Sequence, residues 1–460
     1  MQRRYIVRKE GNKRLILFFT GWSTDFRVLS EIEIPSGYDL LCCWDYRLLF
    51  WEPFTKDYDE IIIVAWSFGV SAANEILSRG LLSGNITGLY AMNGSIFPVD
   101  SEKGIPPAIF ESTRANLNDK TLQKFRLRIC GGKERFLSSS EKLNSESSVT
   151  DLKEELDRFE EISSSEIHPQ DWDYAFVSEN DKIFPIENLR SAWTSTPVMV
   201  LENSEHYPDF QAIFDLIIKD KENIGRKFEK SISSYKDNAT TQLYLAHRLG
   251  ELLPSRFPRT GRVLEIGSGA GCLTQLVDSK LQPEEFTIID LTSESPLPDA
   301  KFIPGDVEIE IKKLPSDYYD IVVSGSTVQW LHSSYRTFRE IFRILKPGGK
   351  FIFSTFVKGN MKEISALTGR TLLYHDSDQW KKIVEKTGME VKLCETESRE
   401  IFFDKVSDVF NHIKNTGVNS LNGKNKSVRE IKELIQRYPK DSEKYKLTYN
   451  TLVINAVKPI

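Results

Sequence analysis

Ser67 follows the apolar run IIIVAW and begins the sequence SFGV. A serine hydroxyl attacks a carbonyl carbon only when a base accepts its proton and nearby donors stabilise the resulting oxyanion. A nucleophile elbow provides this arrangement at a sharp strand-to-helix turn, and it requires small residues two positions before and after the serine. Ala65 and Gly69 occupy those positions. The stretch predicts a nucleophilic serine, although the same short pattern also occurs where a buried strand simply ends.

The partners of such a serine follow it in the chain, the acid first and the base second. His206 comes directly after a predicted strand, in LENSEHYPDF, and is a better candidate base than His168, which lies in a proline-containing loop. Asp181 follows the strand-like run YAFVS and is the expected acid, with Glu179 as a nearby competitor. A Ser67, Asp181, His206 set would take up the serine proton and orient the histidine ring.

The oxyanion donors are expected to be backbone N–H groups. One belongs to the residue after the nucleophile, Phe68, and the other to the loop after an early strand. In FFTGWST that loop contains Trp22 as the second donor, and Gly21 before it allows the backbone to approach closely.

A different kind of site is predicted in the second half, where VLEIGSGAGCL reads as a strand, a glycine-rich loop and a helix. The glycines are Gly267, Gly269 and Gly271, and glycine lets backbone turn tightly against a ligand. A dinucleotide fingerprint would need a further glycine at the position of Cys272. The spacing, with Glu265 before it, instead resembles motif I of class I methyltransferases that bind S-adenosyl-L-methionine.

The rest of that methyltransferase pattern follows in order. Its implied cofactor contacts are Asp290 for the ribose, Asp306 for the adenine amino group, Val307 beside the adenine ring, and Leu291. Taken singly, each carboxylate is equally consistent with a surface cap, and only the combination indicates a cofactor site.

Alternating strands and helices must position these residues. Apolar runs at 15–20, 39–44, 61–66, 88–92, 174–178 and 198–202 predict a parallel sheet in the first half, and the polar stretch 106–165 predicts a helical insertion over it. Runs at 262–266, 286–290, 320–325, 349–356, 390–396 and 451–457 predict a second sheet. We expect an α/β-hydrolase-like domain with a helical lid at 1–222 and a Rossmann-like class I methyltransferase domain at 223–460.

Composition excludes several classes of protein. The 460 residues are 28% charged and 40% hydrophobic with a net charge of −5, which is typical of globular chains and not of nucleic-acid or membrane proteins. The five cysteines form neither a CxxC nor a Cys/His cluster, so we expect no metal site and no disulfide framework. With no signal peptide recognisable, the expected location is the cytoplasm.

The first half resembles the BioG family of pimeloyl-acyl carrier protein methyl ester esterases, in FFTGWS, in DYRLLFWEPFTKDYDEIIIVAWSFGVSAANEIL and in SENDKIFPIENLRSAW. The resemblance implies Ser67 as nucleophile, His206 as base and Asp181 as acid, acting on a pimeloyl methyl ester. The lid stretch KTLQKFRLRICGGKER is basic. Lys124, Arg126 and Arg128 within it would dock the acidic acyl carrier protein, or form an ordinary solvated helix face.

The second half resembles the BioC family of malonyl-acyl carrier protein O-methyltransferases, in IGRKFEKSISSYKDNATTQLYLAHRLGELL, STVQWL and FSTF. The resemblance implies that Tyr235 and Gln242 close over the cofactor and that Gln329 and Trp330 border the substrate. Core packing explains Trp330 equally well.

Together the two resemblances predict a bifunctional enzyme of biotin biosynthesis. One half would methylate the malonyl carboxylate and the other would hydrolyse the pimeloyl methyl ester. Two alternatives remain open at this point. The halves could act on unrelated small molecules without a carrier protein, or one half could be an inactive module that only binds the carrier protein.

Overall fold

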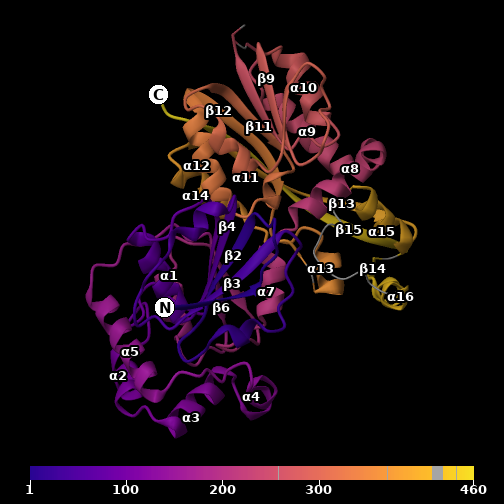
Figure 1. Ribbon diagram of the computed structural model, residues 1–460. Coiled ribbons are helices and arrows are strands. Elements are labelled where there is room, and N and C mark those ends of the chain that lie inside the picture. Colours follow the sequence, from indigo (N-terminus) through magenta and orange to yellow (C-terminus); the bar gives the residue numbers. More distant parts are fainter. Residues whose placement is uncertain (257, 259, 370, 417–427, 442) are drawn as a thin grey trace. The chain divides into compact units, whose positions relative to one another are not determined.

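The computed structural model describes residues 1–256, 258, 260–369, 371–416, 428–441 and 443–460. They form two compact units, Met1–Phe214 and Asp215–Ile460, each with its own β-sheet (Figure 1). The division falls inside α7 (Phe210–Ile217), whereas residue 222, the predicted boundary, lies in the first turn of α8 (Lys221–Asn238). Within the described residues, no helix has both the length and the apolar character needed to span a membrane.

The N-terminal unit contains a seven-stranded sheet in the order β1-β3-β2-β4-β5-β6-β7. All neighbours pair in parallel except β1 and β3, which are antiparallel. The strands are β1 (Gln2–Val7), β2 (Arg14–Phe19), β3 (Tyr38–Trp44), β4 (Glu60–Trp66), β5 (Ile86–Met92), β6 (Tyr174–Ser178) and β7 (Val198–Leu201). Strand β1 was not predicted because QRRYIV is charged and partly exposed, as an edge strand can be.

Strand β4 is the most buried of these. Every residue of EIIIVAW is buried, because both faces of a parallel sheet are covered by other elements. Helix α1 (Phe68–Ser78) begins one residue after β4 and packs against β4 and β2. The unit also contains α6 (Ile186–Ala192), which precedes β7.

The helical insertion, residues 106–165, lies between β5 and β6. It consists of α2 (Pro107–Ala115), α3 (Asp119–Ile129), α4 (Lys133–Ser139) and α5 (Val149–Ser164), and Figure 1 shows these helices gathered beyond one side of the sheet. Helix α5 starts with a capping box between Ser148 and Asp151. Its buried face carries Leu152, Leu156 and Phe159, and α5 packs through it against the rest of the unit.

The C-terminal unit contains an eight-stranded sheet with the path β10-β9-β8-β11-β12-β15-β13, and β14 pairs with β15. The strands are β8 (Arg262–Ile266), β9 (Glu285–Asp290), β10 (Lys301–Pro304), β11 (Tyr319–Gly325), β12 (Leu345–Phe356), β13 (Glu390–Phe403), β14 (Lys440–Asp441) and β15 (Lys444–Val457). Strand β15 runs antiparallel to both β12 and β13, and the strands from β10 to β12 are parallel. Short β10, KFIP, has no apolar run and was not predicted.

Helices cover both faces of this second sheet. The helices that follow α7 are α8, α9 (Thr240–Leu252), α10 (Cys272–Leu281), α11 (Val307–Glu310), α12 (Ser334–Ile344), α13 (Lys362–Thr368), α14 (Ser377–Lys386), α15 (Val406–Asn415) and α16 (Val428–Arg437). Two buried apolar clusters result, because neighbouring strand residues face opposite sides of a sheet. Leu264 belongs to one cluster and Val263 to the other.

Phe338 of α12 is central to the first cluster. It is fully buried and its ring lies 5.0 Å from that of Phe351, 5.2 Å from that of Phe353 and 5.9 Å from that of Trp380.

We predict that Phe338→Ala lowers the free energy of unfolding of the C-terminal unit by about 3–5 kcal/mol, because it removes buried area and leaves a cavity. Urea unfolding followed by circular dichroism measures the change. Phe402→Ala, at a phenylalanine that is 49% exposed, is the control and should cost less than about 1 kcal/mol. Equal effects of the two substitutions would contradict the packing described here.

Candidate active sites

Ser67 occupies the single-residue turn between β4 and α1 with φ 58° and ψ −129°, a conformation that side-chain-bearing residues seldom adopt. Close packing makes the turn possible. A Cβ atom on Gly69 would lie 2.3 Å from the carbonyl oxygen of Phe19, and one on Gly94 would lie 2.2 Å from that of Ser67. Both positions therefore accept only glycine. The predicted strand, turn and helix are present around Ser67.

Three side chains far apart in the sequence meet at this turn. His206 Nε2 lies 2.9 Å from Ser67 Oγ, and His206 Nδ1 lies 2.8 Å from Asp181 Oδ2. Because a carboxylate can only accept, Nδ1–H donates to Asp181 and Nε2 is left to accept the serine proton. The Asp181 and His206 side chains are 0% and 2% exposed. The arrangement is a continuous hydrogen-bonded chain from hydroxyl to carboxylate.

Surrounding groups hold both partners in place. Asp181 Oδ1 accepts from the backbone N–H groups of Ile183 at 2.7 Å and Phe184 at 3.0 Å. The carbonyl oxygen of His206 accepts from Trp66 Nε1 at 2.8 Å and from Asn93 Nδ2 at 3.0 Å. These hydrogen bonds fix the Asp181 carboxylate and the His206 backbone, and the bond between the two side chains orients the His206 ring.

The competing candidates lie elsewhere. Glu179 accepts from the backbone N–H of Asn203 and is exposed. His168 is also exposed, and its backbone carbonyl accepts from Asn74 Nδ2. The structure thus brings Asp181 and His206, rather than Glu179 and His168, to Ser67.

The predicted oxyanion residues lie beside the serine. A Cβ atom on Gly21 would be 3.0 Å from Ser67 Cβ, so the loop after β2 passes directly against the nucleophile candidate. Phe68 is the first residue of α1, and N–H groups in the first turn of a helix have no acceptor within that helix.

Helix α5 contacts Trp22 and Phe68, the two residues whose backbone N–H groups are the predicted oxyanion donors. The Trp22 indole Nε1–H donates to the carbonyl oxygen of Leu152 at 2.9 Å, and the Phe68 ring stacks on Phe159 with 4.3 Å between centroids. Phe110 and Phe184 also contact Phe68 edge-on, at 6.2 and 5.9 Å. The surroundings of Ser67 are therefore aromatic and apolar, and the helical insertion supplies part of them.

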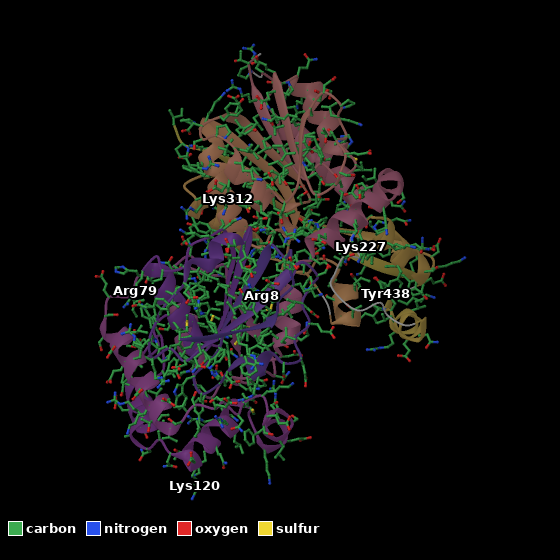
Figure 2. The ribbon with its side chains drawn as sticks, in the orientation of Figure 1. Arg8, Arg79, Lys120, Lys227, Lys312 and Tyr438 are labelled. Carbon is green, nitrogen blue, oxygen red and sulfur yellow. The ribbon has the colours of Figure 1, made fainter. Side chains whose placement is uncertain are left out.

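The basic stretch of the insertion divides into exposed and buried members. Lys124 and Arg128 are exposed, and Figure 2 shows Lys120 projecting from the outer end of the insertion. Arg126, predicted to dock a partner, is instead buried. It donates to Asn144 Oδ1 at 3.1 Å and to the Ser23 carbonyl at 3.4 Å, and burial lowers the pKa of its guanidinium. That prediction was wrong because Arg126 falls on the inward face of α3.

The C-terminal unit contains a cavity with an empty volume of about 1040 Å³, part of it open to solvent. It lies at the carboxyl ends of β8, β9 and β11, where the glycine-rich loop follows β8. Several residues that the sequence singled out as cofactor contacts line it, namely Gly267, Gly269, Asp290, Leu291, Asp306 and Val307. This is the cavity that we call the cofactor cavity.

Asp290 is tied to the glycine-rich loop. Its Oδ2 accepts from the N–H of Gly269 at 2.9 Å and its Oδ1 accepts from the N–H of Thr292 at 2.8 Å. Gly269 itself has φ 49°, and a Cβ atom built on it would meet nothing within 4 Å. Its bare backbone therefore borders open space that a ligand can occupy.

Asp306 has a partner that the sequence did not indicate. Lys221, at the start of α8, is 2% exposed and its Nζ lies 3.1 Å from Asp306 Oδ2 and 2.8 Å from Glu308 Oε2. Burial acts to raise the pKa of Glu308, but Lys221 and His332 outweigh it and hold that pKa below its usual range. A lone lysine in a charged stretch of sequence gives no signal of such a contact.

Two predicted cofactor residues do not line the cavity. Glu265 on β8 is fully buried, and burial raises the pKa of its carboxyl to about 8, with Asp290 adding to the effect. Gly271 is the N-cap of α10 with φ 77°, and a Cβ atom there would lie 2.6 Å from that of Pro296. Neither is among the described residues that border the cofactor cavity. Their assignment to the cofactor site therefore stays a prediction, with Glu265 buried beneath the loop and Gly271 shaping its last turn.

The residues predicted from the leading helices and from STVQWL lie together. Tyr235, Gln242 and Trp330 line the cofactor cavity and also a smaller cavity beside it, and Gln329 lines the smaller one. Ser326 lines both as well and was not singled out from the sequence.

Comparisons with known proteins agree with this division. Residues 1–215 match the family model for the pimeloyl-ACP methyl esterase BioG, and residues 264–353 match a methyltransferase domain. Malonyl-acyl carrier protein O-methyltransferase of Bacteroides fragilis is 32% identical over 97% of this chain and 93% of its own length. The enzyme of that name from Chlorobium phaeovibrioides is 35% identical over 48% of this chain and 89% of its own.

Among solved structures, BioG from Haemophilus influenzae is 32% identical and covers 45% of this chain and 94% of its own, with a TM-score of 0.41. The match to the Bacteroides enzyme extends through both units. The chain therefore belongs to the malonyl-acyl carrier protein O-methyltransferase family and carries a BioG domain at its N-terminal end.

Proposed function

We propose that the N-terminal unit is an α/β-hydrolase-like serine esterase acting on pimeloyl-acyl carrier protein methyl ester. The C-terminal unit, a class I methyltransferase, methylates the free carboxyl of malonyl-acyl carrier protein. The hydrogen-bonded chain of Ser67, His206 and Asp181 is the observation that carries the esterase proposal. Family membership and the cofactor cavity support the methyltransferase.

In the esterase, Ser67 Oγ attacks the ester carbonyl while His206 Nε2 accepts the hydroxyl proton. Methanol leaves with that proton and the acyl group remains on Ser67. A water then attacks the acyl-enzyme, with His206 again taking a proton and returning it to Ser67 as the pimeloyl carboxylate departs. Asp181 keeps Nδ1 protonated and stabilises the charged ring in both steps.

The backbone N–H groups of Phe68 and Trp22 would stabilise the oxyanion of each step. Their peptide units are fixed before substrate arrives, so no reorganisation is needed as charge develops. The aromatic side chains around Phe68 exclude water, which strengthens these interactions.

The cofactor cavity fits S-adenosyl-L-methionine. Gly267 to Ala270 present backbone without bulky side chains, and Gln242 Oε1 is buried there without a hydrogen-bond partner in the described chain. Asp290 would accept from ribose hydroxyls and Asp306 from the adenine amino group, with Leu291 and Val307 against the rings. Glu265 and Gly271 belong to the same proposed cofactor site, although neither borders the cavity in the described chain.

When bound, the cofactor supplies a sulfonium methyl group, and the acceptor carboxylate oxygen bonds to the methyl carbon as the carbon–sulfur bond breaks toward sulfur. A carboxylate is already ionised near neutral pH, so the protein has to provide neither a base nor a metal. Its contribution is alignment in a partly closed pocket.

The two activities make sense together because a free carboxylate is costly to bury in the apolar sites that extend acyl chains. A methyl ester removes that charge, and hydrolysis restores it once the chain is complete. The exposed basic residues Lys124 and Arg128 would contact an acidic carrier protein. The proposal also includes a cytoplasmic location and a functional boundary near residue 222. The five cysteines are free thiols.

We predict opposite mass changes on two carrier-protein substrates. Malonyl-acyl carrier protein with S-adenosyl-L-methionine should gain the mass of one CH₂ group, and pimeloyl-acyl carrier protein methyl ester should lose it without added cofactor. Mass spectrometry of the intact carrier protein measures both. The same two acyl groups can also be supplied as small thioesters without a carrier protein. If these react as efficiently as the carrier-bound substrates, a function without a carrier protein is favoured.

Ser67→Ala should reduce ester hydrolysis by about 10³-fold or more and leave methyl transfer unchanged, because it removes only the nucleophile. Ser71→Ala is the matched control. Ser71 lies on α1, is buried like Ser67, and its Oγ has no hydrogen-bond partner in the described chain. Full hydrolysis by the Ser67 variant would refute the serine mechanism.

Asp290→Asn should weaken S-adenosyl-L-methionine binding by about tenfold, because the amide loses acceptor capacity toward the ribose and disturbs the Gly269 contact. Calorimetric titration of the full-length protein gives the Kd. Asp299→Asn, at an exposed residue of the same unit, should leave the Kd unchanged. An unchanged Kd for Asp290→Asn would remove that residue from the cofactor site.

A further inference from the structure

A smaller cavity, the side cavity, adjoins the cofactor cavity and has an empty volume of about 340 Å³. The two cavities share several lining residues, namely Phe228, Tyr235, Gln242, Ser326 and Trp330. The shared residues mark a junction through which a group in one cavity can reach a group in the other. A methyl acceptor needs such a junction, because its carboxylate must meet the methyl group while the rest of the molecule lies elsewhere.

Two hydrogen-bond donors at the junction have no partner among the described residues. They are the indole Nε1–H of Trp330 and the hydroxyl of Ser326, and both atoms are buried. Trp330 is 6% exposed and packs edge-on against Phe228 at 5.8 Å. Packing accounts for the ring of Trp330 and leaves its N–H available to a ligand at the junction of the two cavities.

Ser326 has a second unusual property. It follows β11 directly with φ 53°, a left-handed conformation that costs free energy for a residue with a side chain. Its N–H donates to the Ser354 carbonyl at 3.0 Å, and its own carbonyl accepts from Gln329 Nε2 at 2.6 Å. The backbone is thus held on both sides while the hydroxyl is left unused.

None of the described residues that line both cavities is positively charged. Among the described residues that line the side cavity, none carries a charge near neutral pH. Lys221 lines the cofactor cavity, but Asp306 and Glu308 already neutralise its ammonium group. An anionic acceptor would therefore meet neutral donors and not a salt-bridge partner.

We propose that Trp330 Nε1–H and Ser326 Oγ–H hold the carboxylate of the methyl acceptor at this junction, with its acyl chain in the side cavity. The inference rests on the proposed methyl transfer to a malonyl carboxylate. Neutral donors orient the carboxylate without a protein cation that would compete for its charge. After transfer the ester is neutral, its hydrogen bonds from these donors lose their charge assistance, and the product is released.

The test compares the binding of a carboxylate with that of its methyl ester. Malonyl-pantetheine and its methyl ester are titrated calorimetrically into the full-length protein saturated with S-adenosylhomocysteine. The wild type should bind the carboxylate at least about tenfold more tightly, since hydrogen bonds to a charged group are the stronger ones. Trp330→Phe, which keeps an aromatic ring but removes the N–H, should reduce that preference by about tenfold.

Trp380→Phe is the matched control. Trp380 is also buried in the same unit, and its Nε1 likewise has no partner among the described residues. It packs on Phe338 and Phe353 and lines neither cavity, so its variant should keep the wild-type preference. Ser326→Gly, which tolerates the left-handed backbone, should reduce the preference as Trp330→Phe does. Each variant should keep the wild-type circular dichroism spectrum and urea unfolding midpoint, which separates loss of a donor from loss of structure.

Two results would overturn the inference. One is a wild type that binds carboxylate and ester equally, and the other is a Trp330→Phe variant with an undiminished preference. Failure of the proposed function would look different, since wild-type protein would then leave malonyl-acyl carrier protein unmethylated even where the binding preference is present.

Discussion

A left-handed residue directly after a strand is the constraint on which both sites depend. Asp45, Ser67 and Asn93 follow β3, β4 and β5 with φ of 59°, 58° and 43°, and Ser326 follows β11 with φ 53°. Such a turn reverses the chain within one residue and presents its side chain at the carboxyl edge of the sheet. It persists only where packing holds it, as the Gly69 and Gly94 contacts do for Ser67. At Ser67, the candidate nucleophile and the strained backbone are therefore the same residue.

Acidic side chains outnumber basic ones around the cofactor cavity. Lys221 brings one positive charge into it, while Asp290 and Asp306 line it and Glu308 lies behind. Carboxylates therefore outnumber the single ammonium group among these four. That balance suits a ligand with a positive centre, and it leaves the neighbouring side cavity free of charged side chains. The same distribution that attracts a sulfonium thus leaves an acceptor carboxylate without a competing cation.

The sequence predicted the features that depend on neighbouring residues, and it missed those that depend on contacts between residues far apart in the chain. Apolar runs located the main strands, and the turn around Ser67 and the glycine loop were recognisable because their geometry demands small residues at fixed spacings. Arg126, Lys221 and Ser326 were misjudged or missed. Arg126 bonds Asn144 and Ser23, and Lys221 bonds residues some 85 positions away. Contacts of that kind leave no periodic trace in a sequence. The burial of Glu265 could not be predicted either, since motif spacing does not say which face of a strand a carboxylate occupies.

The hydrogen bond from the Trp22 indole to the Leu152 carbonyl constrains how the helical insertion can change during evolution. Surface insertions ordinarily tolerate gains and losses of residues. Here, deleting one residue of α5 ahead of Leu152 would rotate the helix that follows by about 100°, because an α-helix has about 3.6 residues per turn. The carbonyl would turn away from Trp22, and Phe159 would leave Phe68. The loops of the insertion can therefore vary in length among descendants of this sequence, while the phase of α5 is inherited together with Trp22.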